Sequence, residues 1–544
     1  MKRQILILFT MLMVISISAC APTATSVPTE AALPIAEEPR YTSYPTAAPR
    51  PLVEQPRIIS PTPVPPTIYE YAPTAAYIVP TIAVPAPNNG MENYFQDYGV
   101  NPFTSTDRDS LSTFALDVDT ASYEITRSYI YNGAIPPMDA VRAEEFINAF
   151  NQGYAAPRDA AFTLYADGAP SPFIQSDHVL IRFGVQGYRV SDYERKSLNL
   201  TFVVDVSGSM GSENRLELVK DALRQLVGRL DERDMVTIVA YSDDAWLVLQ
   251  PTNASDSYRI NRAIDQLYPT NSTNADAGLR LGYQYAYRNL NTEAVNRVIL
   301  CSDGVANTGN TDPETILSFV QGYVDSGITL TGIGVGMGNY NDVLLEKLAD
   351  RGDGNYYYVN SGEEAHEVFV EKLTSTMQVI AYDAKIQIEF DPQVVSAYRL
   401  IGYENRNVAD QDFRNDSVDA GEIGAGMSAV ALYEVELRDR KQGRIATAKL
   451  RWQDADTREV IEINGDFYTY DLANKFEATS PYFQLTSTVA AYAEILRASP
   501  YVEGSLDDIA SQARRVSNLF EESEQAREFA DLAERTAYLN RYEW

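Results

Sequence analysis

A short apolar run followed at once by oxygen-bearing side chains constrains the fold of this chain more than any other feature. Residues 200–204 are largely apolar and partly β-branched, and a run of this length cut off by Ser and Gly is typical of a buried strand. Asp205, Ser207 and Ser209 come directly after it. Ligands of open α/β sheets bind just beyond the carboxyl ends of strands. One carboxylate and two hydroxyls at this place indicate a site for a hard cation such as Mg²⁺; the alternative is a loop that only caps the next helix.

The surrounding sequence alternates strand and helix patterns from about residue 197 to residue 376. Such alternation implies right-handed βαβ units and a mostly parallel, doubly wound sheet of the Rossmann-like α/β class. The short turn 242–245 between two strand-like runs predicts a hairpin, and therefore an antiparallel strand at one edge of the sheet. Asp243 and Asp244 in this turn lie on the same face as the cation site if the hairpin is placed correctly. They could tune the charge around the ligand or simply form the turn, and we favour the turn.

The stretch that ends in Ser209 resembles the metal-ion-dependent adhesion site of von Willebrand factor type A (VWA) domains. That motif joins Asp-x-Ser-x-Ser to a distant Thr and a distant Asp that precedes Gly. The matching positions here are Asp205, Ser207, Ser209, Thr273 and Asp303. The resemblance implies that these residues hold Mg²⁺, for which Mn²⁺ or Ca²⁺ could substitute, directly or through water. It also implies that an open coordination position binds an acidic residue of a partner protein.

The segments on both sides of the central domain resemble the dedicated extensions of one family of bacterial VWA lipoproteins. The motifs that carry the resemblance lie at residues 101–148 and 400–434, and the resemblance covers nearly everything after the proline-rich N-terminal region. Met427 and Ser428 stand where relatives usually have His-Thr. Both flanks are rich in strand patterns, so we predict that they pair with each other and that the VWA domain is inserted between them. A charged helical region follows from about residue 482. The domains expected after the N-terminal region are an N-terminal module at 91–196, the VWA domain at 197–376 and a C-terminal domain at 377–544.

The first ninety residues predict export and a lipid anchor. A basic start, an apolar core and small residues before Cys20 are typical of a signal peptide at 1–20, and Ile-Ser-Ala-Cys resembles a lipobox whose Cys20 carries the lipid. The alternative is an ordinary secretory signal with an incidental cysteine. Residues 21–90 are rich in Pro, Thr, Ala and Val, which favours an extended, disordered stalk that could reach on the order of 200 Å. We therefore expect the folded part to lie outside the cytoplasm, anchored to the cell membrane or envelope.

The charge of the chain excludes one class of partner. A formal net charge of −31 argues against nucleic acid, whose phosphates need Lys and Arg to neutralise them. With only two cysteines, the chain has no disulfide framework.

Three local patterns suggest other activities and are rejected on their spacing. Asp117 and Asp119 begin like an aspartyl-phosphate phosphatase, but Ala121 stands where that motif needs Thr or Val; we expect the two Asp to cap a helix near Ala121. The glycines at 332–338 lack Gly-x-Gly-x-x-Gly spacing and predict a turn rather than a dinucleotide site. The stretch 410–415 has no Gly at the sixth position of a calcium loop.

Three classes of function then remain. The first is a binding module that engages a protein through a bound cation. The second is a metal-dependent hydrolase, disfavoured because the two histidines are isolated and no nucleophile–His arrangement is present; His178 is interpreted as a strand-edge residue. The third is a scaffold with a vestigial metal site, disfavoured because all five motif positions are intact. We therefore predict a binding protein and not an enzyme.

Overall fold

The computed structural model describes residues 50–52, 57–58, 95–116, 118–191, 193–304, 313–336, 342–371, 377–416, 418 and 420–542. All of them belong to one compact unit, Pro45–Trp544. The predicted signal peptide, Cys20, Asp117 and most of the predicted stalk lie outside the described residues.

The central sheet confirms the predicted fold class. Its strand order is β12-β11-β10-β7-β8-β9, in which neighbouring strands from β12 to β8 run parallel and β9 runs antiparallel to β8. The hairpin predicted at 242–245 is therefore present, with β9 at the edge. The strands are β7 Ser197–Asp205, β8 Met235–Tyr241, β9 Ala245–Asn253, β10 Ala294–Ser302, β11 Ile328–Val335 and β12 Tyr356–Val359.

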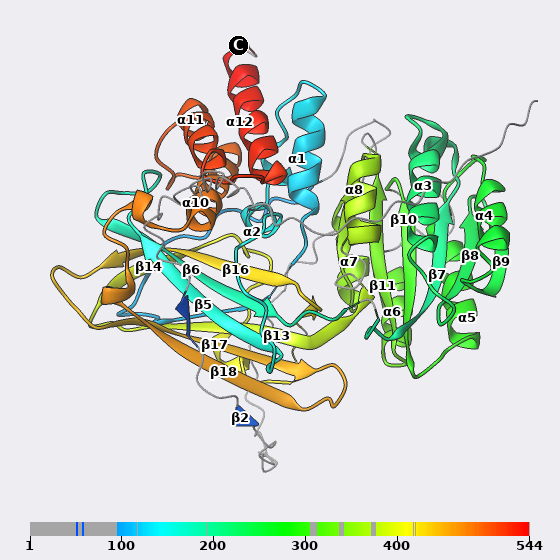
Figure 1. Ribbon diagram of the computed structural model, residues 1–544, viewed down its shortest axis with the longest axis horizontal. Helices are drawn as coiled ribbons and strands as arrows, with labels where there is room; N and C mark the ends of the chain where they lie inside the picture. The colour runs from blue at the N-terminus through cyan, green and yellow to red at the C-terminus, as the bar shows by residue number, and fades with distance from the viewer. Residues whose placement is uncertain are drawn as a thin grey trace, which may run out of the picture. The chain divides into compact units, whose positions relative to one another are not determined.

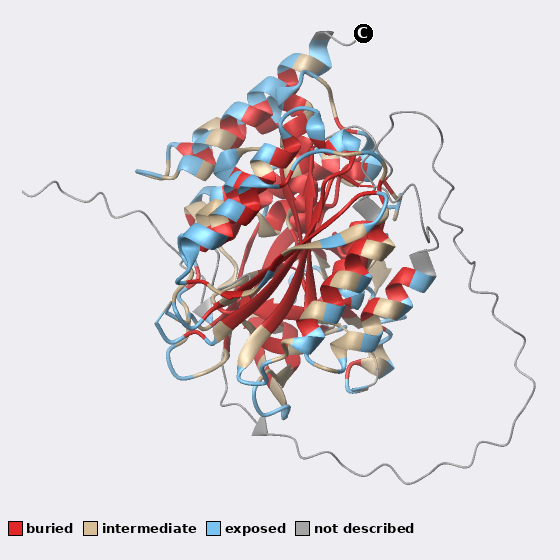
Figure 2. Cartoon of the chain, turned by 90° about the vertical axis from the view of Figure 1, so that its right-hand side faces the viewer, coloured by how far each residue is buried: buried red, intermediate tan, exposed pale blue. Residues whose placement is uncertain are grey.

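Helices cover both faces of this sheet because successive strand residues point to opposite sides. Phe202 and Val204 belong to the core under one set of helices, whereas Val203 belongs to the core under the other. Figure 2 shows the buried strands running between helices whose outer faces are exposed. The first set is α3 Arg215–Val227, α4 Ser257–Asp265, α8 Gly362–His366 and the π-helix η3 Glu367–Glu371; the second is α5 Ala275–Arg288, α6 Pro313–Val324 and α7 Asp342–Arg351.

The flanking segments pair with each other, as predicted. β6 precedes the VWA domain and β16 follows it, and the two strands pair antiparallel from His178–Glu436 to Gln186–Ser428. β4 and β13 pair across the same insertion. One sheet has the order β1-β5-β6-β16-β14-β3 and the other β15-β13-β17-β18-β2, and apolar residues from both form a shared core. We call this pair of sheets the platform (Figure 1). Its strands are β3 Thr104–Ser105, β4 Leu111–Ala115, β5 Phe162–Ala169, β6 His178–Gly187, β13 Val379–Phe390, β14 Val395–Ile401, β15 Gly421–Gly424, β16 Ser428–Leu437, β17 Arg444–Asp454 and β18 Val460–Tyr468, besides β1 and β2.

Two short pieces of the predicted stalk form strands of the platform, so the prediction of an extended, disordered stalk does not hold for them. β1 (Arg50–Pro51) pairs with β5, and β2 (Arg57–Ile58) pairs with β18. The Leu52 N–H also donates to the Leu164 carbonyl at 2.8 Å. Proline is tolerated on edge strands, where its missing N–H need not join a ladder, so a proline-rich composition does not exclude this pairing.

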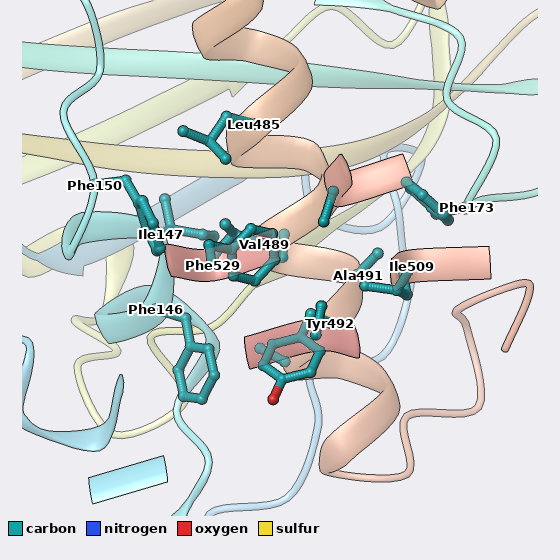
Figure 3. Close-up of a cluster of buried hydrophobic side chains, with 14 of the residues drawn as sticks. Phe146, Ile147, Phe150, Phe173, Leu485, Val489, Ala491, Tyr492, Ile509 and Phe529 are labelled. Atoms are coloured by element: carbon teal, nitrogen blue, oxygen red, sulfur yellow. The ribbon is translucent and has the colours of Figure 1, made fainter. Parts of the chain in front are cut away.

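A layer of helices from both sides of the VWA domain packs around one apolar core. Its helices are α1 Ala121–Tyr131, α2 Ala143–Asn148, α10 Pro481–Leu496, α11 Leu506–Ser517 and α12 Glu524–Tyr542. Figure 3 shows Phe146 and Phe150 of the N-terminal module beside Tyr492 and Phe529 of the C-terminal region. The C-terminal helical region is thus present, but its core is completed by helices that precede the VWA domain.

The N-terminus of α1 differs from the prediction. The helix begins at Ala121 with Thr120 as N-cap and no side-chain capping bond. The Asp119 carboxylate instead accepts the Tyr356 N–H at 3.1 Å and lies 3.7 Å from the Arg406 guanidinium. Asp119 therefore links the N-terminal module to β12 of the VWA domain.

Candidate metal-ion site

The five residues of the predicted cation site lie at the carboxyl ends of two adjacent parallel strands and in the loops beside them. Asp205 is the last residue of β7, and Asp303 follows the last residue of β10, which pairs with β7 in parallel. Ser207 and Ser209 belong to the loop that carries the 3₁₀ turn η2 (Gly208–Gly211), and Thr273 lies two residues before α5. This is the edge at which open α/β sheets bind ligands.

Four of the five side chains are joined by short contacts. The Ser207 N–H donates to Asp205 Oδ1 at 2.8 Å, the Ser207 and Ser209 hydroxyls lie 3.0 Å apart, and the Ser209 hydroxyl donates to Asp303 Oδ1 at 3.1 Å. Thr273 is buried. The structure therefore brings oxygen atoms of Asp205, Ser207, Ser209 and Asp303 to one place, although Asp205 and Asp303 are almost a hundred residues apart.

The loop that carries Thr273 is tied to the same place through its backbone. The Gly208 N–H donates to the Asn271 carbonyl at 2.8 Å, and the Thr270 N–H and hydroxyl donate to the Val206 carbonyl at 2.6 and 2.9 Å. A Cβ on Gly208 would stand 3.2 Å from the Asn271 carbonyl oxygen, so this loop contact favours glycine.

Asp243 also accepts hydrogen bonds from this loop, which the sequence analysis did not predict. Its carboxylate accepts hydrogen bonds from the Ser272 hydroxyl and, at 3.2 Å, from the Asn271 side-chain amide. These hydrogen bonds lower the pKa of Asp243. The interpretation of Asp243 as a turn residue is thus incomplete, because the carboxylate also positions the segment that contains Thr273.

Asp205 is fully buried and has two further partners. The Tyr241 hydroxyl donates to Asp205 Oδ2 at 3.3 Å, and the Ser302 hydroxyl donates to it at 3.0 Å. Burial and the nearby Asp303 carboxylate raise the pKa of Asp205 to about 6, while hydrogen bonds from Ser207 and Ser302 act in the opposite direction. A bound cation would favour the ionised carboxylate. Tyr241 and Ser302 are the last residues of the strands on either side of β7. Their position at the carboxyl ends of predicted strands could have identified them as neighbours of the site.

Arg215 is the site residue for which the sequence holds no local signal. Its guanidinium donates to Asp303 Oδ2 at 2.9 Å and contacts Glu213 at 3.1 Å. Gly336 has φ +75° and a Cβ there would stand 2.2 Å from Arg215 Nε, so this glycine packs against the Arg215 side chain. Gly332 and Gly334 lie within strand β11, so the turn predicted at 332–338 is wrong at these two positions. One of the two carboxylates thus already has a cationic partner.

The donor set fits a hard divalent cation. It consists of two carboxylates and three hydroxyls, all oxygen ligands of the kind that Mg²⁺ prefers. Among the described residues no group of three or more His, Cys, Asp or Glu side chains is placed to hold a metal ion. That finding is consistent with this set, in which hydroxyls outnumber carboxylates. Ser209 is exposed, so the site opens to solvent on its side.

Three family models match the chain over most of its folded length. The model described as von Willebrand factor type A domain matches residues 199–371, and one described as von Willebrand factor matches residues 89–182. The central domain is therefore a VWA domain, a type of module that serves protein interaction or adhesion and commonly binds a divalent cation. A model described as the C-terminal region of the uncharacterized protein YfbK matches residues 375–539.

Similar proteins identify the family of VWA proteins to which the chain belongs. The Escherichia coli protein named "Uncharacterized protein YfbK" is 35% identical over 463 residues, which cover 80% of this chain and 79% of that relative. The chain belongs to this family of bacterial VWA proteins with a C-terminal extension. "Uncharacterized protein sll0103" of Synechocystis is 30% identical over 38% of this chain and 48% of its own length. The solved von Willebrand factor type A structure from Catenulispora acidiphila covers 68% of this chain and 88% of its own, with 15% identity and a TM-score of 0.39.

Proposed function

We propose that this protein is a lipid-anchored, extracytoplasmic binding protein that engages an acidic residue of a partner protein through a divalent cation. Asp205, Ser207, Ser209, Thr273 and Asp303 hold the cation, directly or through water. Mg²⁺ is the ion we propose, with Mn²⁺ or Ca²⁺ as substitutes. The bound cation supplies a positive charge, and a carboxylate of the partner protein binds to it.

The convergence of two carboxylates and the hydroxyls at one strand edge carries this proposal. Hydroxyls are neutral, so they bind a cation without cancelling its charge, and the pairing of Asp303 with Arg215 reduces the negative charge of the site further. A cation held in this way attracts an anionic group from outside. The exposed Ser209 gives a partner access to it.

The positions of the two histidines support a binding role over hydrolysis. His178 Nδ1 lies 2.7 Å from the buried Glu434 carboxylate in the platform, and His366 Nδ1 lies 2.8 Å from Gln225. Both histidines are thus bonded to residues outside the candidate metal site. A hydrolase would need a general base beside the cation.

The anchor rests on the sequence before residue 95. Cys20 is proposed as the lipid-bearing residue, and the proline-rich stretch after it as the spacer. No helix in the described part of the chain is long and apolar enough to span a membrane. Mass spectrometry of the membrane-extracted protein tests the anchor: acyl chains on Cys20 are expected, and an unmodified N-terminus at another residue contradicts it.

Substitution of Asp205 by Ala should abolish the cation-dependent binding of the partner. Removing one of two carboxylates is expected to weaken Mg²⁺ binding at least about 100-fold, measured by isothermal titration calorimetry on the purified chain. Cross-linking from cells, with and without chelator, should then recover a partner protein with the wild-type chain and not with Asp205→Ala. Asp244→Asn is the matched control, because Asp244 lies near the same edge without belonging to the motif.

Two outcomes contradict the proposal. One is wild-type Mg²⁺ affinity in an Asp205→Ala protein whose circular dichroism is native. The other is partner recovery that chelator leaves unchanged.

A further inference from the structure

A cavity of about 210 Å³ lies apart from the candidate metal site and is lined by none of its five residues. Residues 96–100 and residues from the stretch 138–144 line part of it. Glu404 and Arg497 contribute from the C-terminal region. The cavity is thus built where segments from both sides of the VWA insertion meet.

Glu144, which lines this cavity, has one carboxylate oxygen with no hydrogen-bond donor among the described residues. Glu144 is 1% exposed, and its Oε1 accepts from Arg142 Nε at 3.2 Å, but its Oε2 has no hydrogen-bond partner in the part of the chain that the structure describes. Gly402 packs closely against this atom, since a Cβ there would stand 2.6 Å from it. A buried carboxylate oxygen without a donor is rare in proteins and calls for a ligand group or water that supplies one.

The buried charges around the cavity do not balance. Arg142 and Arg497 are each shared among several carboxylates, with N–O distances of 2.6–3.2 Å for Arg142 and 3.0 Å from Arg497 to Glu404. The neighbouring Arg406 contacts Glu346, and Arg399 contacts Glu494. Each of these two arginines also contacts carboxylates outside the cavity. The carboxylates around the first two arginines are Glu144, Glu145, Glu346, Glu404 and Glu494.

The raised pKa of Glu404 agrees with this excess of negative charge. Burial raises its pKa, the Arg497 guanidinium lowers it, and the Glu144 carboxylate raises it again. Buried charges are costly unless they are compensated. A positive group placed between Glu144 and Glu404 would supply the missing compensation.

We propose that this cavity binds a small organic cation whose ammonium group donates hydrogen bonds to Glu144 Oε2 and to Glu404. The carboxylates here do not form a metal cluster among the described residues, and the cavity is larger than one ion. A cavity of this volume has room for several water-sized groups. Tyr98, Met138 and Val141 give the apolar part of such a ligand a surface to contact. The class of ligand is therefore a short alkylamine.

Calorimetric titration of the full chain with n-butylamine tests this proposal. Saturable binding is expected for n-butylamine and not for n-butanol or butyrate, which have similar size but no positive charge. Glu144→Gln should weaken n-butylamine binding at least about tenfold, because the ammonium loses a charged acceptor. Glu389→Gln, on platform strand β13, is the matched control and should bind like the wild type.

A second pair of variants keeps the test valid if Glu144→Gln does not fold. Met138 lies at the rim of the cavity and is 56% exposed, so Met138→Lys brings an ammonium group to the same place. It should compete with n-butylamine and lower its affinity, whereas Met138→Leu should not. No saturable binding to the wild type, equal binding of amine and alcohol, or unchanged binding in both Glu144→Gln and Met138→Lys would overturn the proposal.

Discussion

Replacing Asp234 by Ala should lower the free energy of unfolding by about 3–5 kcal/mol. Asp234 is fully buried, and both its oxygens face Arg195, with N–O distances of 2.9 and 2.7 Å. The same carboxylate accepts the backbone N–H groups of Leu198 and Asp231 at 2.9 and 2.8 Å. Arg195 belongs to the segment that leads from β6 of the platform into β7. The substitution removes the buried carboxylate partner of this guanidinium, which keeps only the Lys196 carbonyl at 3.1 Å and the Asp231 carboxylate at 3.5 Å, and it leaves two backbone N–H groups without their acceptor.

Chemical unfolding followed by circular dichroism measures this effect. Two probes are needed, because a chain with several packed units need not unfold in one step. Asp231→Ala is the control: its carboxylate lies 3.5 Å from the same guanidinium but is 42% exposed, and its backbone N–H still donates to Asp234, so loss of this carboxylate should cost under about 1 kcal/mol. An Asp234→Ala protein as stable as Asp231→Ala would show that the Arg195 pair does not hold this entry together.

The junction between the VWA domain and the helical layer should weaken as pH rises. Arg127 of α1 contacts Glu124 of its own helix, Glu364 of α8 at 3.2 Å, and Glu528 of α12. Three carboxylates from three parts of the chain thus share one guanidinium. Burial raises the pKa of Glu124 to about 8, with Arg127 opposing it and Glu364 adding to it, and burial also raises the pKa of Glu364.

The direction of the pH dependence follows from which state holds the proton. Glu124 in the folded chain keeps its proton up to about pH 8, because its pKa is raised, whereas in the unfolded chain it releases the proton near its ordinary pKa of 4.5. The stabilising contribution is therefore fully present below about pH 4.5 and is lost progressively as pH rises through 8. Each pKa unit corresponds to about 1.4 kcal/mol, and partial exposure of the carboxyl reduces the effect, so we expect on the order of 2 kcal/mol.

Thermal unfolding between about pH 5 and pH 8 measures this slope. Glu124→Gln cannot ionise, so its unfolding temperature should vary less over that interval and exceed the wild-type value at the upper end. Glu524→Gln, an exposed substitution at the start of α12, should keep the wild-type slope. Identical slopes for wild type and Glu124→Gln would contradict the assignment.

The positions of the candidate site residues were readable in the sequence because a local rule places them. Asp205 and Asp303 follow apolar runs, and parallel strands end at one edge of a sheet, so their proximity follows from fold class alone. The hairpin before β9 is equally local. The pairing of the flanks was also predictable, since strand-rich segments on both sides of an α/β domain need partners for their edges.

Contacts between distant segments could not be predicted in this way. Arg215, Asp243 and Asp119 carry no local pattern that names their partners, and the proline content of residues 50–58 hid two edge strands. The core shared by Phe146 and Tyr492 joins residues on either side of the VWA insertion.

The sequence by itself determined the class of the central domain, its inserted position and the oxygen-rich strand edge. Side-chain periodicity and strand-end chemistry are local properties, and one chain displays them without its neighbours. Only the tertiary structure decided which charges are buried together: Arg195 with Asp234, Arg127 with three glutamates, and Glu144 with an oxygen left without a donor. The physical reason is that burial and pairing depend on every element packed around a group, and those elements here come from both ends of the chain.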